Sequence, residues 1–148
     1  MNREDTLEAL QKARVAHEVQ MAKIKSVIEG NEVENPTAAL KTECTFGKWL
    51  YNEDNKVQKI LGLQFYNNID ILHTRWHSEY IRIFEIFFKK QEKKGFFSKM
   101  LGNSKIDGMD LDKAKLYYSE LLKTTQELLK ALDISQRRIQ ALSDSKFS

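Results

Sequence analysis

Apolar residues recur at alternating spacings of three and four along three stretches of the chain, which is the pattern of an amphipathic helix with one buried face. The first stretch is expected to end near Gly30, because residues 30–36 contain that glycine, two asparagines and the only proline. Its predicted buried seam comprises Leu7, Leu10, Arg14, His17, Met21, Ile24 and Ile28. Arg14 and His17 are the polar members of this otherwise apolar stripe.

A second long helix is predicted from Phe65, and a third after Asp107 or Asp110, either of which can cap its first turn. The seam of the second comprises Ile69, His73, Trp76, Tyr80, Ile83 and Phe87, widened by Leu72, His77, Phe84 and Phe88. The seam of the third comprises Ala114, Tyr118, Leu121, Thr125, Leu128, Leu132, Ser135, Ile139 and Leu142. Residues 89–108, a lysine-rich stretch that also contains glycines, are interpreted as a connector between these helices.

Residues 37–63, between the first two long helices, are predicted to be a broken helical element. Thr37 is the expected N-cap, whereas Gly47, the polar run NEDN and Gly62 interrupt the helix. No segment alternates with a period of two, and no internal repeat is visible. The expected fold is therefore all-α: an antiparallel four-helix bundle with a broken second helix, formed by residues 1–148 as a single domain.

Composition narrows the classes of partner and compartment. The 148 residues include 24 Lys and Arg against 21 Asp and Glu, a net charge of +3 spread along the chain, so no nucleic-acid partner is expected. The single cysteine excludes an internal disulfide, and the polar start MNREDTLEAL lacks the apolar core of a secretion signal. No apolar stretch reaches the ~20 residues that span a bilayer. We expect a cytoplasmic protein without a transmembrane segment.

All three histidines of the chain fall on predicted buried seams. A buried imidazole needs a partner for each ring nitrogen, so three histidines are not expected to be buried together by chance. His73 and His77 are four residues apart on one helix face, where two imidazoles can converge on a single ion. Zinc prefers nitrogen and sulfur donors and takes four ligands in a structural site, which makes His17 and Cys44 the candidates that complete it.

Helix geometry places these residues at similar heights in the bundle. At ~1.5 Å per residue, His17 lies ~20 Å from the end near Gly30, and His77 lies ~18 Å from the opposite end near Phe65. In a bundle ~40 Å tall these two levels meet near the middle. Cys44 then has to reach the same level from the irregular second element.

A metal-free interpretation stays open for each residue taken alone. Each histidine can be hydrogen-bonded within the core, and Cys44 can be a small apolar filler. Three buried imidazoles and a thiol without a metal leave several polar groups to satisfy, whereas one Zn²⁺ satisfies four of them at once. The four residues together therefore favour a zinc site in the bundle core.

The mid-helix His17, the motif CTFGKWLY at residues 44–51 and the histidine pair of HTRWH resemble the bacterial chemoreceptor zinc-binding (CZB) domain family over most of the chain. The resemblance implies one zinc ion bound by His17, Cys44, His73 and His77. Where the family often has an aromatic residue three positions after the first histidine, this chain has Gln20. Family members commonly dimerise and sit beside a signalling or diguanylate cyclase module, which implies a homodimer and a partner of the chemoreceptor or diguanylate cyclase type.

A zinc-bound cysteine is a thiolate, and the thiolate is the form that oxidants attack. The resemblance implies sensing of oxidants such as hypochlorous acid: oxidised Cys44 becomes a poor ligand, and residues 37–63 lose their tie to the core. Gly47 and the NEDN run are candidate hinges. Two alternatives stay open, a reversible zinc sensor that modulates chemotaxis or cyclic-di-GMP signalling partners, and a non-sensing structural-zinc interaction module.

Three further side chains are candidates for supporting the metal site. Asp70 precedes His73 by three residues and can accept the N–H that a metal-bound imidazole leaves free. Phe46 and Trp49 are expected to pack around the site, where they would limit water near the sulfur.

An enzyme is not expected. Four protein ligands close the coordination position that a hydrolytic zinc site keeps open, HTRWH lacks the glutamate of HExxH, and a di-iron carrier needs bridging carboxylates and more than three histidines. A second alternative to a zinc sensor is a protein that only mediates interactions. The lysine-rich connector carries Phe96, Phe97, Met100 and Leu101, which can dock on an acidic partner or a membrane surface, or tuck back onto the bundle.

Overall fold

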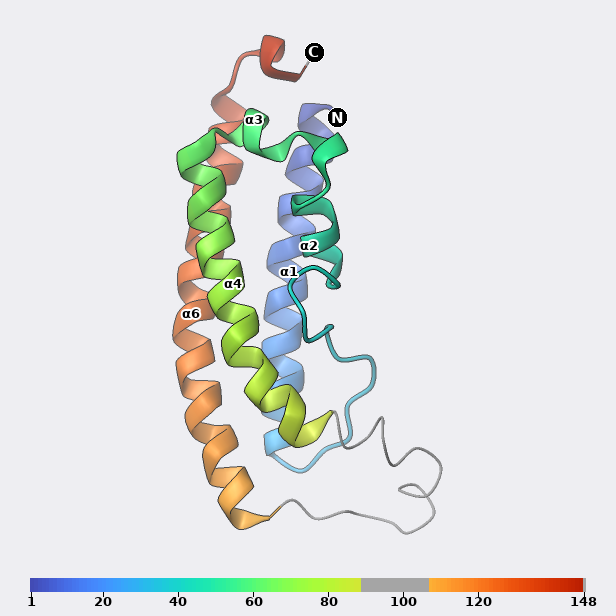
Figure 1. The fold of residues 1–148 in the computed structure, drawn as a ribbon, viewed down its shortest axis with the longest axis vertical. Helices are drawn as coiled ribbons and strands as arrows, with labels where there is room; N and C mark the ends of the chain where they lie inside the picture. Colours follow the sequence, from blue (N-terminus) through green and yellow to red (C-terminus); the bar gives the residue numbers. More distant parts are fainter. Residues whose placement is uncertain (89–106, 148) are drawn as a thin grey trace.

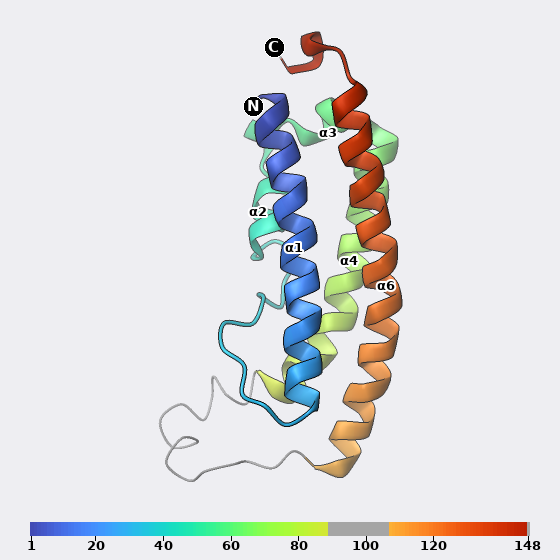
Figure 2. The same ribbon diagram turned by 180° about the vertical axis from the view of Figure 1, so that it is seen from behind.

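Three long helices run side by side along the longest axis of the molecule, seen from opposite sides in Figure 1 and Figure 2. They are α1 (Arg3–Ile28), α4 (Leu63–Phe87) and α6 (Gly108–Ala141), and α6 packs along both of the others. In Figure 1, α1 and α4 descend while α6 ascends. The computed structural model describes residues 1–88 and 107–147, and this part of the chain contains helices and irregular segments but no strand. The predicted all-α class is confirmed.

The ends of the long helices follow from local sequence. The Asn2 side chain accepts a hydrogen bond from the N–H of Asp5 (2.7 Å) and so caps α1. The Asp107 side chain accepts from the N–H of Met109 (3.1 Å), which decides between the two predicted caps of α6. Gly30 follows the end of α1 with a φ of 95°, a left-handed conformation that favours glycine and stops the helix where predicted.

The element between α1 and α4 differs from its prediction. It contains two short helices, α2 (Thr45–Leu50) and α3 (Val57–Leu61), with a 3₁₀ turn, η1 (Glu53–Asn55), between them. Residues 29–44 form no α-helix. The predicted four-helix bundle is therefore not confirmed, because a mostly irregular segment climbs back along α1 in place of a fourth long helix (Figure 1).

The predicted N-cap at Thr37 is wrong. Asn35 has a left-handed φ of 52° and Pro36 has no N–H to donate, so the backbone turns here instead of entering a helix. The N–H of Thr37 donates to Oε1 of Gln20 (2.8 Å), a side chain of α1 that is only 1% exposed. Gln20 thus ties the irregular segment to α1, and the first helix of that segment is capped by Cys44 instead.

The predicted seams of α4 and α6 are largely confirmed. All of the α4 seam residues are buried except Phe84, which is half-buried. All of the α6 seam residues are buried except Tyr118 and Leu142, which are also half-buried. Strict three-four spacing therefore identified the core-facing stripe of both helices.

The buried face of α1 is rotated from the predicted seam. Its buried residues are Thr6, Leu10, Ala13, His17, Gln20, Met21, Ile24 and Val27. Leu7, Arg14 and Ile28 of the predicted seam are half-buried. Arg14 lies on the flank that faces α6, where its guanidinium pairs with the carboxylate of Asp133 (3.7 Å). A charged residue at a predicted seam position therefore marks an interhelix ion pair at the rim of the core.

Aromatic side chains of α4 fill the space between the long helices. The fully buried Trp76 lies 4.7 Å from the ring of His17, centroid to centroid, and its Nε1–H donates to Oγ1 of Thr125 on α6 (2.8 Å). Tyr80 stacks on Trp76, and its hydroxyl donates to the carbonyl of Thr37 (2.7 Å). These contacts hold α1, α4, α6 and the irregular segment around one core, at the level of His17.

None of the helices in residues 1–88 and 107–147 is long and apolar enough to cross a membrane. The lysine-rich connector with Phe96, Phe97, Met100 and Leu101 lies outside the described residues, so its role as a docking segment stays a prediction.

Candidate metal centre

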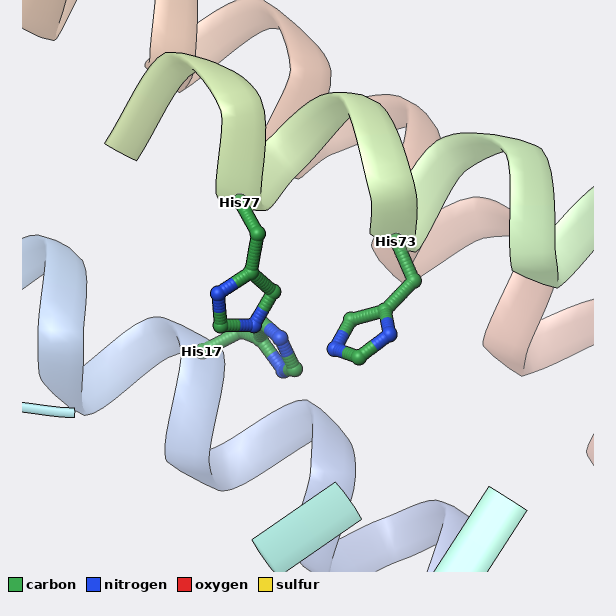
Figure 3. Close-up of side chains that lie close together, drawn as sticks. All are labelled: His17, His73 and His77. Carbon is green, nitrogen blue, oxygen red and sulfur yellow. The ribbon is translucent and has the colours of Figure 1, made fainter. Parts of the chain in front are cut away.

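Three imidazoles point toward one another in the core, His17 from α1 and His73 and His77 from α4 (Figure 3). One ring nitrogen of each lies within 4.8 Å of one ring nitrogen of the others. The three side chains belong to residues that are 3%, 0% and 4% exposed, respectively. The convergence predicted from the four-residue spacing and from the matching helix levels is confirmed.

Backbone carbonyls orient two of these rings. Nδ1 of His17 lies 2.6 Å from the carbonyl oxygen of Ala13, and Nδ1 of His77 lies 2.9 Å from that of Ala39. Because a carbonyl only accepts, each Nδ1 carries the proton and each Nε2 carries the lone pair. Both Nε2 atoms are buried without a hydrogen-bond partner. Such orphaned acceptors are costly in a core and are the atoms that a metal ion would bind.

Cys44 adjoins this group through His73. Its sulfur lies 3.4 Å from Nε2 of His73, and the residue is 5% exposed. Two ligands of one tetrahedral zinc ion, at about 2.3 Å for sulfur and about 2.0 Å for nitrogen, are about 3.5 Å apart. The distance between this sulfur and nitrogen therefore suits a shared zinc ion, and it joins Cys44 to the cluster of three histidines through His73.

The motif CTFGKWLY holds the cysteine in place through its glycine. The N–H of Gly47 donates to the sulfur of Cys44 (3.2 Å), which is the N-cap interaction of α2. A Cβ added to Gly47 would lie 1.6 Å from the carbonyl oxygen of Lys41 and 3.3 Å from the sulfur. Backbone cannot yield at that distance, so only glycine lets the turn of residues 41–44 close against α2. Gly47 was expected to interrupt the helix and instead lies inside α2, and its role as a hinge stays a prediction.

Burial controls the protonation of the candidate ligands in the metal-free protein. It lowers the pKa of His17 to about 4 and that of His73 to about 2, and it also lowers the pKa of His77. The rings are therefore neutral at pH 7, as ligands must be. Burial raises the pKa of Cys44, against the opposing effect of the hydrogen bond from Gly47. The thiol consequently needs a cation beside it to become a thiolate.

Acidification is expected to destabilise the metal-free protein. His17 has a pKa of about 4 when folded and about 6.5 when unfolded, so the unfolded chain binds more protons as the pH falls through that window. Stability is therefore complete above about pH 6.5 and decreases below it, by about 2 kcal/mol for His17 alone between pH 7 and pH 5. Urea unfolding with chelator present measures this. A free energy of unfolding that stays constant from pH 7 to pH 5 would contradict it.

The predicted contact between Asp70 and His73 is not direct. The hydroxyl of Tyr51 lies between them, 2.6 Å from Oδ1 of Asp70 and 3.2 Å from Nδ1 of His73. Burial, together with the hydrogen bond to Asp70, raises the pKa of Tyr51 strongly, so the hydroxyl keeps its proton. Tyr51 was not among the predicted site residues, although it is the last residue of CTFGKWLY and follows Cys44 by seven positions.

The two aromatic residues of the motif play different parts. Phe46 is buried and its ring packs edge-on against His17 (6.0 Å) and His73 (5.0 Å), which confirms its predicted place at the site. Trp49 is half-buried and stacks on Phe46 (5.9 Å), while its Nε1–H donates to the sulfur of Met1 (3.3 Å). Trp49 therefore covers Phe46 from outside, one ring further from the histidines than Phe46.

Comparison with known proteins agrees with this geometry. The family model CZB, chemoreceptor zinc-binding domain, matches residues 17–84, a segment that contains all four candidate ligands. The resemblance predicted from the sequence is confirmed over that segment. Neither the curated proteins nor the solved structures gave a significant match. The link between the site and zinc therefore rests on the family model and on the donor set.

Proposed function

From the match of residues 17–84 to the chemoreceptor zinc-binding domain, we propose that this protein is a regulatory sensor built around one Zn²⁺. His17, His73 and His77 would bind the ion through Nε2 and Cys44 through its sulfur. The observation that carries the proposal is the pair of buried, partnerless Nε2 atoms of His17 and His77, together with a buried thiol 3.4 Å from Nε2 of His73. Three nitrogens and one sulfur are a donor set that zinc prefers.

A sensor fits this site better than an enzyme does. Four protein ligands fill a tetrahedral zinc ion and leave no position for a substrate or an activated water. The carboxylate of Asp70 does not face the proposed metal position. It is connected to Nδ1 of His73, the outer ring nitrogen, through the hydroxyl of Tyr51. We therefore propose a non-enzymatic role in which the state of the site is passed to a partner.

The proposed signal is oxidation of the zinc-bound sulfur. Hypochlorous acid converts a thiolate to a sulfenic acid and chloride, R–S⁻ + HOCl → R–SOH + Cl⁻, so that sulfur loses two electrons and chlorine gains them. Sulfenic sulfur is a poor ligand, and Cys44 is the N-cap of α2 as well as a candidate ligand. Oxidation would then free α2 and its neighbouring irregular backbone from the core.

The output is proposed from the family alone. A homodimer in the cytoplasm would pass the rearrangement of residues 37–63 to a partner of the chemoreceptor or diguanylate cyclase type. α2 and α3 are short helices of six and five residues, so few backbone hydrogen bonds of their own would resist such a rearrangement.

A reversible zinc sensor is the second candidate, and one observation favours it. Burial raises the pKa of Cys44, so a proton competes with zinc for this ligand at neutral pH. Zinc titration against a competing chelator separates the candidates. Affinity far tighter than the free zinc of a cell would exclude reversible sensing, and zinc binding without any structural response to oxidant would leave a structural-zinc interaction module.

The wild-type protein is expected to purify with one zinc per chain and to release it on addition of an equimolar amount of hypochlorous acid. Elemental analysis measures the metal, a chromogenic chelator measures its release, and a sulfenic-acid probe should label Cys44. The Cys44→Ala variant is the matched control. It should bind zinc more than about 100-fold more weakly, because loss of a metal ligand lowers the affinity more than loss of a group that only hydrogen-bonds to a ligand. A metal-free wild type would refute the proposal.

A further inference from the structure

We propose that Asp70, acting through the hydroxyl of Tyr51, holds His73 in the tautomer whose Nε2 can bind a metal. This inference rests on the proposed zinc site for its functional meaning, but the tautomer itself is a property of the metal-free protein. It makes Tyr51 and Asp70 positioning residues, since neither contacts the atom that faces the metal.

His73 differs from the other two candidate ligands in the partner of its outer nitrogen. The carbonyl groups that face Nδ1 of His17 and of His77 can only accept, so they determine those two tautomers by themselves. Nδ1 of His73 faces a hydroxyl, which can donate or accept. If Tyr51 donated to Nδ1, the proton of His73 would sit on Nε2, and that nitrogen would have no lone pair for a metal.

Asp70 decides which way the hydroxyl points. Tyr51 has a single proton, and Oδ1 of Asp70 lies 2.6 Å from its oxygen, against 3.2 Å for Nδ1 of His73. A carboxylate only accepts, and hydrogen bonds to a charged acceptor are shorter and stronger than neutral ones. The proton of Tyr51 therefore goes to Asp70. The oxygen of Tyr51 is left to accept from Nδ1–H of His73, which directs the lone pair of Nε2 toward Cys44.

Two further donors keep Asp70 in position. Nζ of Lys41 and Oγ1 of Thr74 each lie 3.4 Å from the same Oδ1, and Nζ of Lys41 also lies 2.7 Å from Oγ1 of Thr74. The ammonium group sits 5.0 Å above the ring of Tyr51 as well. Lys41 thus contacts both members of the relay, so the geometry of the carboxylate and the phenol is set together.

One short segment consequently holds His73 on both sides. Residues 41–51 supply Cys44 at Nε2, Tyr51 at Nδ1 and Lys41 at Asp70. A movement of residues 41–51 that withdraws Cys44 from His73 would therefore also withdraw Tyr51, which controls the tautomer of that histidine.

Long-range ¹H–¹⁵N NMR of the imidazoles in the metal-free protein tests the inference. The wild-type His73 should carry its proton on Nδ1. In Asp70→Ala the hydroxyl of Tyr51 is free to donate to Nδ1, so the proton should move toward Nε2. In Tyr51→Phe neither arrangement is enforced, and a mixture is expected. Tyr118→Phe on α6, which leaves the relay intact, should match the wild type.

Zinc affinity provides a second readout on the loaded protein, which does not require the metal-free variants to be folded. Each single variant should bind zinc about 10- to 100-fold more weakly. Because Asp70 acts through Tyr51, the double variant should bind no more weakly than the worse single variant. Additive losses, or a wild-type His73 protonated on Nε2, would overturn the inference. Correct tautomers in a protein that binds no zinc would instead refute the proposed function and leave the tautomer control standing.

Discussion

Replacing Gly47 with alanine is expected to lower the free energy of unfolding by about 3 kcal/mol and to weaken zinc binding in the same step. Gly47 is inside α2, where alanine normally stabilises a helix by about 1 kcal/mol relative to glycine. The expected sign is the opposite, because the new Cβ would lie 1.6 Å from the carbonyl oxygen of Lys41. Since backbone must move to relieve this overlap, the neighbouring Cys44 moves with it.

Gly108→Ala is the matched control for this substitution. Gly108 is the first residue of α6, and a Cβ added there meets nothing within 4 Å. Its replacement should leave stability unchanged or raise it by up to about 1 kcal/mol, and zinc binding should be unaffected. Chemical denaturation with and without chelator measures both variants. A Gly47→Ala protein with wild-type stability and zinc affinity would show that the turn of residues 41–44 closes without requiring glycine.

His17→Leu is expected to abolish the stabilisation by zinc while making the metal-free protein about 1 kcal/mol more stable. The gain follows from the buried Nε2 of His17, which has no hydrogen-bond partner and costs free energy in the absence of a metal. The carbonyl of Ala13, which loses the Nδ1–H donor, is inside α1 and remains within the helical hydrogen-bond pattern. Leucine fills a similar volume beside Trp76 without a polar atom.

Thermal unfolding with zinc and with chelator separates the two effects. The wild type should gain stability from zinc, and the His17→Leu variant should gain almost none, with zinc affinity lowered more than about 100-fold. Met21→Leu, a volume-conserving change at another buried position of α1, should keep the wild-type response to zinc. Wild-type zinc affinity in His17→Leu would remove His17 from the ligand set, and a strongly destabilised metal-free variant would show that its imidazole is satisfied in the core.

Both substitutions test how the candidate zinc ligands affect the stability of the core. A metal-free core keeps neutral imidazoles and a protonated thiol at pH 7, because burial disfavours every charged form. Zinc would resolve this by supplying the charge that a thiolate needs. Because the buried polar groups of an empty site cost free energy, we expect zinc binding to increase the free energy of unfolding strongly.

The long helices were predictable because their seams are long and regular. Every predicted α4 seam residue is buried except the half-buried Phe84, and Asp107 caps α6 as one of two expected caps. The seam of α1 was less accurate. Arg14 occupies a seam position in the sequence, yet it pairs with Asp133 at the rim, a partner 119 residues away that no local pattern reveals.

The second element could not be predicted to the same degree. The polar run NEDN and Gly62 correctly indicated breaks, whereas Gly47 was expected to interrupt the helix and lies inside α2. Thr37 looked like an N-cap and is instead held by the Gln20 side chain. Such a contact depends on which residue of α1 lies opposite the returning chain. Local propensity carries no information about that, so tertiary packing decided the start of α2.

The three long helices and the shared burial of the histidines could be predicted from residue spacing alone, because spacings of three and four place His73, His77 and the rest of their face toward one core. The surroundings of the candidate ligands, in contrast, depend on how distant segments pack against one another. Tyr51 stands between Asp70 and His73, and Ala39 orients His77. A backbone carbonyl has the same chemistry whatever its side chain, and a hydroxyl reaches its partner only once the segments have packed, so neither contact leaves a signature in the sequence.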